Sequence, residues 1–140
     1  MKILLAVDGS RYSKKMLAYI TTHDSLFNQD HAFVLLNVQP PLPGRARVAV
    51  GKEVVEKYYE EESEKVLAPI SKFLSRHRIE AKRLMKVGHV AETISKIADQ
   101  GKYDLVIMGS HGQGALLKLV MGSVATSVLA HCKVPMLLVR

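Results

Sequence analysis

Residues 104–114, DLVIMGSHGQG, hold the pattern that decides the fold of this 140-residue chain. A continuous apolar run, residues 105–108, is followed at once by Gly109, Gly112 and Gly114. An uninterrupted apolar run of this length is typical of a strand that is buried on both faces of a parallel sheet. Glycines allow the backbone to approach a ligand closely and to turn its N–H groups inward. The stretch therefore predicts a buried strand that opens into a binding loop.

Four other apolar runs, residues 3–7, 33–38, 84–87 and 136–139, have the length of strands. The third of these differs from the rest, because lysines and an arginine alternate with apolar residues around it and place charge on both faces. Such a pattern favours an edge strand.

Helical patterns separate the predicted strands. Apolar residues at helical spacing follow Ser10, which can cap a first helix. A long helix begins near Lys52, and Pro69 is expected to kink it. A third helix begins near Val90, and a fourth covers about residues 122–130. The remaining stretch, 39–51, contains three prolines and is expected to be an irregular loop, either a mobile lid whose Arg45 or Arg47 reaches the ligand or an inert surface loop.

Strands and helices thus alternate along the chain, which predicts the α/β class. We expect a single doubly wound domain over residues 1–140, with five parallel strands, right-handed crossovers and helices on both faces of the sheet. Sheets of this kind bind ligands beyond the carboxyl ends of their strands. The binding site should then follow residues 7, 38, 87 and 108.

The composition excludes several other classes of protein. The formal charge is +7, but the basic residues are scattered and are not interleaved with aromatic residues, which argues against a nucleic-acid-binding protein. No apolar run approaches the roughly 20 residues that cross a membrane, and the first residues lack the features of a signal peptide. The lone cysteine, Cys132, fits a reducing compartment. These features predict a cytoplasmic location.

Gly122 and Ser123 open the last predicted helix, where free N–H groups and the helix dipole favour an anion. Together with the glycine loop they describe a phosphate cradle. The loop has the glycine spacing of a Walker A motif, but Ala115 and Leu116 replace its lysine and hydroxyl residue. A dinucleotide fingerprint would need three spaced glycines after the first strand, where only Gly9 stands.

The spacing Gly109-x2-Gly112-x9-Gly122-Ser123 matches the G-x2-G-x9-G-[ST] motif of the ATP-binding universal stress proteins. The opening, ILLAVDGS at residues 3–10, and the segment GSVATSVLAHCKVPMLLV at residues 122–139 resemble the same family. This resemblance implies strand order 3-2-1-4-5, with ATP held between the first and fourth strands.

The resemblance also implies a role for each matching position. Asp8 would lie near the ribose or a phosphate-bound Mg²⁺, and Val38 would contact the adenine edge through its backbone. Gln113 stands where relatives often carry arginine, which removes one phosphate-facing charge. The remaining positions would line the ribose (Met108 and Gly109) or wrap the phosphates, mainly through backbone N–H groups (Gly112, Gly122, Ser123 and Val124).

We assign no catalytic residue from the sequence. His111 is of a type that serves as a general base, but no second titratable group is placed to orient it, so we expect an exposed loop histidine. The histidines and the cysteine lack metal-ligand spacing, which predicts no metal site built by the protein. The sequence therefore favours an ATP-binding stress-response or regulatory protein with slow or no hydrolysis. The alternative is a protein-interaction module that needs no nucleotide.

Residues 136–139 would form the last strand of the sheet, at an edge in the implied order. An uncharged apolar edge promotes aggregation unless something covers it. Antiparallel pairing with the same strand of a second copy would cover it under two-fold symmetry, and the resemblance points to the same homodimer. Pro135 lacks a backbone donor and should mark the start of the paired segment. A further protein partner is expected, but the sequence does not identify it.

Overall fold

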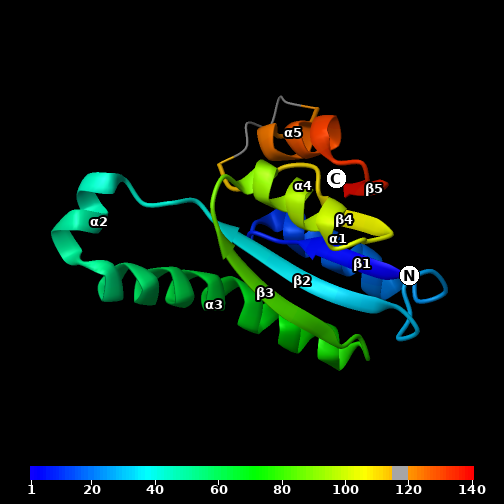
Figure 1. Ribbon diagram of the computed structural model, residues 1–140. Coiled ribbons are helices and arrows are strands. Elements are labelled where there is room, and N and C mark those ends of the chain that lie inside the picture. The colour runs from blue at the N-terminus through cyan, green and yellow to red at the C-terminus, as the bar shows by residue number, and fades with distance from the viewer. Residues whose placement is uncertain (115–119) are drawn as a thin grey trace.

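The computed structural model describes residues 1–114 and 120–140. Ala115 and Leu116, which distinguish the loop from a Walker A motif, lie outside the described residues. A five-stranded, all-parallel sheet forms the centre of the molecule in the order β3-β2-β1-β4-β5 (Figure 1). This confirms the α/β class and the implied strand order. The strands are β1 (Lys2–Ala6), β2 (Ala32–Gln39), β3 (Ala81–Val87), β4 (Leu105–Gly109) and β5 (Met136–Val139).

Helices cover both faces of the sheet, as predicted. The helices are α1 (Arg11–Thr22), α2 (Gly44–Val50), α3 (Lys52–Arg76), α4 (Val90–Gln100) and α5 (Ser123–His131). Buried side chains of α1 and α3, such as Met16 and Ile70, pack on one face with Leu5 of β1. Buried side chains of α4 and α5, such as Ile94 and Val128, pack on the other face. None of the described helices combines the length and the apolar composition that a membrane crossing requires.

Helix boundaries follow the capping signals in the sequence. Ser10 is the N-cap of α1, and its side chain accepts a hydrogen bond from the Ser13 N–H. Helix α3 runs from Lys52, as predicted, and continues through Pro69 as one element. On this helix Tyr59 is 7% exposed whereas Tyr58 is 42% exposed, so the two adjacent rings separate between core and solvent.

The two edges of the sheet differ in character. β3 carries exposed Lys82, Arg83 and Lys86, which confirms that the charged strand is an edge strand. β5 forms the opposite edge, and all four of its residues are half-buried. Charge on an open edge discourages pairing with another chain. β5 has no such protection.

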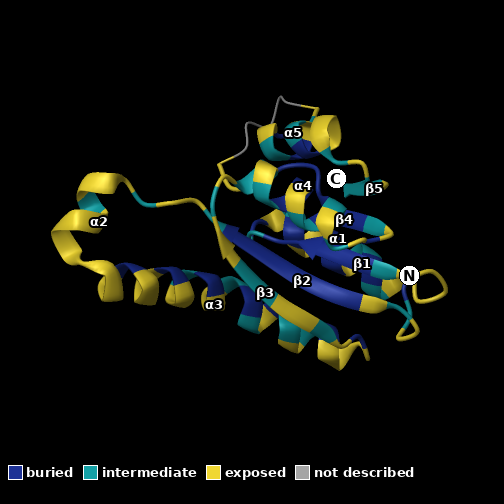
Figure 2. Ribbon diagram, in the orientation of Figure 1, coloured by how far each residue is buried: buried dark blue, intermediate teal, exposed yellow. Residues whose placement is uncertain are grey.

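The prediction of an irregular loop over residues 39–51 is wrong in its second half, because residues 44–50 form helix α2. The three prolines all precede Gly44, and the residues that follow include no helix breaker until Gly51. No residue of α2 is buried. We call residues 44–59, that is α2 and the start of α3, the arm. Figure 2 shows that the arm extends away from the sheet and is mainly exposed.

Candidate functional site

Two adjoining hollows lie at the carboxyl end of the sheet, beyond β1, β2 and β4. The smaller, of about 60 Å³, has mainly apolar walls that include Leu36, Ile94 and Met108. The larger, of about 520 Å³, is in the size range of small-molecule sites. The two hollows share the lining residues Asp8, Val38, Val90, Gly112 and Val124.

The structure brings all eight residues of the sequence prediction to these hollows. Met108 and Gly109 line the smaller one, and Gly122 and Ser123 line the larger one. Asp8, Val38, Gly112 and Val124 line both. Contact between these residues and a nucleotide stays a prediction.

Asp8 joins the turn after β1 to the loop after β4. Its Oδ1 atom accepts hydrogen bonds from the Ser10 N–H and the Ser13 hydroxyl, both at 2.9 Å. Its Oδ2 atom accepts from the Gln113 N–H at 3.1 Å. The Gln113 side chain returns a hydrogen bond from Nε2 to the Asp8 carbonyl oxygen, also at 3.1 Å. Asp8 therefore links the two loops through hydrogen bonds, and its carboxylate already accepts three of them from protein donors.

Gly112 lies directly against that carboxylate. A Cβ atom at this position would come within 2.7 Å of Asp8 Oδ2, closer than real Cβ contacts allow. The glycine therefore lets the loop pass over Asp8 and places backbone, rather than a side chain, on the wall of both hollows.

Gly109 and Gly122 are required for packing within the protein itself. A Cβ atom on Gly109 would meet Tyr12 at 2.7 Å, so this glycine allows α1 to approach the end of β4. A Cβ atom on Gly122 would lie 3.0 Å from the His111 Cα atom. The Gly122 N–H donates to the Ser110 carbonyl at 2.7 Å, so this group is already used. At the start of α5 the N–H groups of Ser123 and Val124 have no acceptor within the helix, and they are the donors available to an anion.

His111 corrects a prediction, because it is buried, with 9% of its surface exposed. Its Nδ1 atom lies 2.8 Å from the Ser110 hydroxyl oxygen, and its ring centroid lies 4.6 Å from that of Tyr12. The loop turns back beneath the first turn of α1, which covers the imidazole. Tyr12 lies about a hundred residues before His111, so no local sequence pattern indicates this packing.

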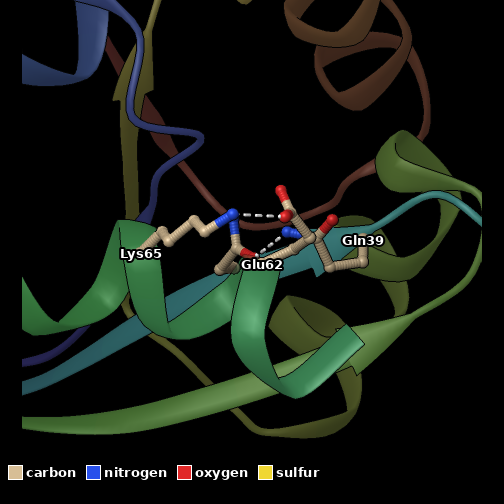
Figure 3. Close-up of polar contacts among 4 residues, drawn as sticks. Gln39, Glu62 and Lys65 are labelled. Carbon is tan, nitrogen blue, oxygen red and sulfur yellow. Dashed lines mark hydrogen bonds and ion pairs between the residues drawn. The ribbon is translucent and has the colours of Figure 1, made fainter. Parts of the chain in front are cut away.

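Sequence reasoning also missed the polar residues that hold the loops in place. The Ser13 hydroxyl accepts from the Asp8 N–H at 3.0 Å and donates to the carboxylate of the same residue. Asn37 donates from Nδ2 to the Val7 carbonyl at 2.9 Å, and Gln39 donates to Asn37 Oδ1 at 2.8 Å. Figure 3 shows Gln39 together with the Glu62–Lys65 ion pair of α3. Ser13 follows the cap residue Ser10 by three positions, a spacing that could have drawn attention to it.

The described residues contain no group of three or more histidine, cysteine, aspartate or glutamate side chains that could hold a metal ion. Asp8 is the one carboxylate among the described residues that line the two hollows. Lysine and arginine are also absent from that described lining.

The model of the universal stress protein family matches residues 1–140. A universal stress protein from Thermus aquaticus, encoded in the QAH/OAS sulfhydrylase 3′ region, is 34% identical over 140 residues, which are 99% of this chain and 97% of that protein.

Solved structures agree with the observed fold. The structure of the protein MJ0577 from Methanocaldococcus jannaschii superposes with a TM-score of 0.79 at 30% identity and covers 99% of this chain and 94% of its own. A universal stress protein from Archaeoglobus fulgidus, in complex with dAMP, has a TM-score of 0.68 at 19% identity and covers 100% and 98% of the two chains. Other structures with the same fold hold cAMP or AMP.

Proposed function

This chain belongs to the universal stress protein family, and we propose that it is an ATP-binding regulatory protein that hydrolyses the nucleotide slowly or not at all. The observation that carries the proposal is the meeting of an apolar hollow and a glycine-lined hollow at the end of β1 and β4. A nucleotide has the same division into an apolar base and a polar phosphate chain.

The smaller hollow would take the adenine end of the nucleotide. Its walls include Leu36, Ile94 and Met108, all buried and apolar. Val38 is on the wall of both hollows, so its backbone is at the right level to contact the base edge. Met108 and Gly109 would contact the ribose.

The larger hollow would take the phosphates. Ser123 and Val124 offer free N–H groups at the start of α5, and the Ser123 hydroxyl can donate as well. Gly112 keeps the opposite wall free of a side chain. Mg²⁺ would arrive with the nucleotide and take its ligands from phosphate oxygens and water, since Asp8 already accepts three hydrogen bonds.

Slow hydrolysis is consistent with the groups around the larger hollow. Efficient phosphoryl transfer needs cations around the terminal phosphate and a group that orients the attacking water. The described residues that line this hollow supply no lysine or arginine, and their one carboxylate is held by loop donors. Such a site favours retention of the nucleotide over its turnover.

The first test identifies the ligand. Freshly purified protein would be denatured and the released small molecules identified by mass spectrometry, followed by calorimetric titration of the ligand-free protein with Mg-ATP. Recovery of ATP or ADP near one equivalent, or saturable binding, is expected. A blank in both measurements would overturn the proposal and favour the interaction module that needs no nucleotide.

We also propose a homodimer formed through β5. This strand is an edge of the sheet, and its residues Met136–Val139 carry no charge. Antiparallel pairing with the same strand of a second copy would satisfy the open edge. Leu137→Lys should lower the self-association measured by sedimentation equilibrium. Because Leu137 also packs against the core on the α1 and α3 face, circular dichroism must show that the variant is folded. A wild-type protein that is monomeric at tens of micromolar would contradict the dimer.

The setting that we propose for this protein is the cytoplasm under stress. The role would be exercised through association with other proteins, controlled by the bound nucleotide. Comparison of affinity-captured partners with and without Mg-ATP tests that control, and identical sets would argue against it.

A further inference from the structure

The arm presents an apolar surface that no other described residue of the chain covers. Val48 is 86% exposed, and Val50, Val54 and Tyr58 are 50%, 55% and 42% exposed. These residues lie on consecutive parts of α2 and the start of α3. A single exposed valine is ordinary, but several neighbouring ones on a projecting element indicate a contact surface.

The tip of the arm, residues 44–52, is purely basic. It contains Arg45, Arg47 and Lys52 and no acidic residue. Lys52 lies 3.9 Å from Glu56 on the same helix. Within residues 1–114 and 120–140, neither Arg45 nor Arg47 forms an ion pair. Two guanidinium groups without an ion pair among the described residues therefore precede the most exposed valine of the tip, Val48, by three residues and by one.

Between α3 and β3 lies a hollow of about 500 Å³ with the opposite character, which we call the acidic hollow. Glu60, Glu61 and Glu64 line it together with Leu67 and Met85, and the remaining lining residues are Ser63 and Arg83. Arg83 pairs with Glu64 at 2.9 Å, and Lys57 lies 3.9 Å from Glu61. Glu60 forms no ion pair within the described part of the chain.

Ser63 is an independent sign that this hollow receives a ligand. The residue is 2% exposed, and its hydroxyl oxygen is a buried polar atom without a hydrogen-bond partner among the described residues. A buried hydroxyl without a partner costs free energy, so a donor that enters the hollow gains by reaching it.

We propose that the acidic hollow binds the arm tip of a second copy of this chain, and that two copies exchange tips under two-fold symmetry. Arg45 and Arg47 of each copy would pair with the glutamates of the other, where the planar guanidinium can bind a carboxylate through two hydrogen bonds. An arginine N–H would also reach the Ser63 hydroxyl. Val48 would pack on Leu67 and Met85, the two apolar residues of the lining.

The arm tip of a chain is too short to reach the acidic hollow of the same chain. α2 joins α3 through Gly51 alone, and its seven residues extend about 10 Å. Glu60 is eight residues into α3, about 12 Å from Lys52, and Glu64 is about 18 Å away. Figure 1 shows α2 beyond the start of α3, at the end of that helix that lies away from β3. A second copy can approach the hollow from outside without unfolding either helix.

Charge reversal tests the exchange. The tip variant is Arg45→Glu/Arg47→Glu, and the hollow variant is Glu60→Lys/Glu61→Lys. When either variant associates with itself, both symmetric contacts bring like charges together. Its self-association constant should therefore fall at least tenfold in sedimentation equilibrium. An equimolar mixture of the two restores opposite charges at both contacts, and its association should return to within threefold of wild type. Rising salt should weaken the wild-type contact.

Two controls separate this contact from other effects. Lys14→Glu/Lys96→Glu changes the net charge as the tip variant does, but on exposed positions of α1 and α4, and should associate as wild type does. All of these variants keep β5 intact, so any pairing through that strand is common to every sample. Val48→Asp, at a side chain that is 86% exposed, should weaken association without loss of helix in circular dichroism.

Association of the tip or hollow variant equal to that of wild type would overturn the exchange. A mixture that associates no better than its two components would overturn it as well. Nucleotide binding is unaffected by these substitutions if the proposal is correct, since no residue that they change lines the two hollows at the end of β1 and β4.

Discussion

The connection after β4 and the connection after β2 both leave the carboxyl end of the sheet. The first packs closely against the rest of the molecule, whereas the second extends away from it. From the last residue of β4 onward the backbone is packed so closely that a Cβ atom on Gly109 would meet Tyr12 and one on Gly122 would meet the His111 backbone. After β2 the chain extends into α2, which has no buried residue. Glycine in the first connection is required by close packing, whereas a Cβ atom on Gly44 in the second would meet only a side-chain atom of Arg47, at 3.8 Å. The same residue type therefore lines a closely packed hollow in one place and begins an ordinary helix in the other.

The strongest test of this contrast places the same side chain in both connections. Gly122→Val should reduce ATP affinity at least a hundredfold, because its Cβ atom would press on the His111 and Ser110 backbone at 3.0 and 3.3 Å and displace the phosphate loop. Gly44→Val, the matched variant, should bind ATP as wild type does. Calorimetric titration measures both, with circular dichroism as the folding control. Equal affinities in the two variants would remove the distinction.

The next test removes the Asp8 carboxylate, which links the loop after β1 to the loop after β4. Asp8→Ala leaves the Ser10 and Gln113 N–H groups and the Ser13 hydroxyl without their shared acceptor. We expect a loss of about 1–3 kcal/mol in the free energy of unfolding and a weakening of ATP binding of roughly tenfold or more. Urea unfolding followed by fluorescence or circular dichroism gives the first value, and titration gives the second. An unchanged free energy of unfolding would show that the Asp8 carboxylate does not stabilise the contact between the two loops.

A smaller effect is expected where the arm joins the domain. The Tyr59 hydroxyl accepts a hydrogen bond from the Leu42 N–H at 2.8 Å. Tyr59→Phe removes that acceptor and should cost about 1 kcal/mol of stability, with ATP affinity changed less than twofold. Tyr58→Phe, on the exposed neighbouring ring, is the matched control and should change neither quantity. A large loss of ATP affinity in Tyr59→Phe would tie the arm to the nucleotide site.

The smallest expected effect concerns α2 itself. None of its residues lines either hollow in the described structure, whereas Gln39 and Pro40, from the same stretch 39–51 that was considered as a lid, line the larger one. Amide hydrogen exchange over residues 44–50 should therefore be equal with and without Mg-ATP. Residues 109–114 and 122–125 should exchange more slowly when Mg-ATP is present. Protection of α2 by the nucleotide would restore the lid.

Runs of apolar residues predicted the buried strands of the sheet reliably. The apolar runs at residues 3–7, 105–108 and 136–139 predicted strands because burial on both faces leaves few other residue types possible. Capping by Ser10 was predictable for a local reason, since the Ser10 side chain and the Ser13 N–H that it accepts from lie three residues apart. All of these signals lie within a few residues of the element that they determine.

Contacts between distant segments were not predictable in this way. His111 is buried because Tyr12, about a hundred residues earlier, lies against it. The hydrogen bond between Gln113 and Asp8 joins two loops that meet only in the folded sheet. Helix α2 was not predicted for a different reason. The three prolines of residues 39–51 disfavour a helix only where they stand, and all of them precede Gly44.

The central place of β1 has a consequence for the order of folding. β1 pairs with β2, as in Ile3 with Phe33, and with β4, as in Ile3 with Leu105. During synthesis the first pairing becomes available early, whereas the second must wait until about a hundred residues have been made. The turn that holds Asp8 therefore exists before the glycine loop that completes the site. A nascent chain that has only its first three strands has half of the proposed nucleotide site, and on that proposal a nucleotide would stabilise this protein only after its last third has been added.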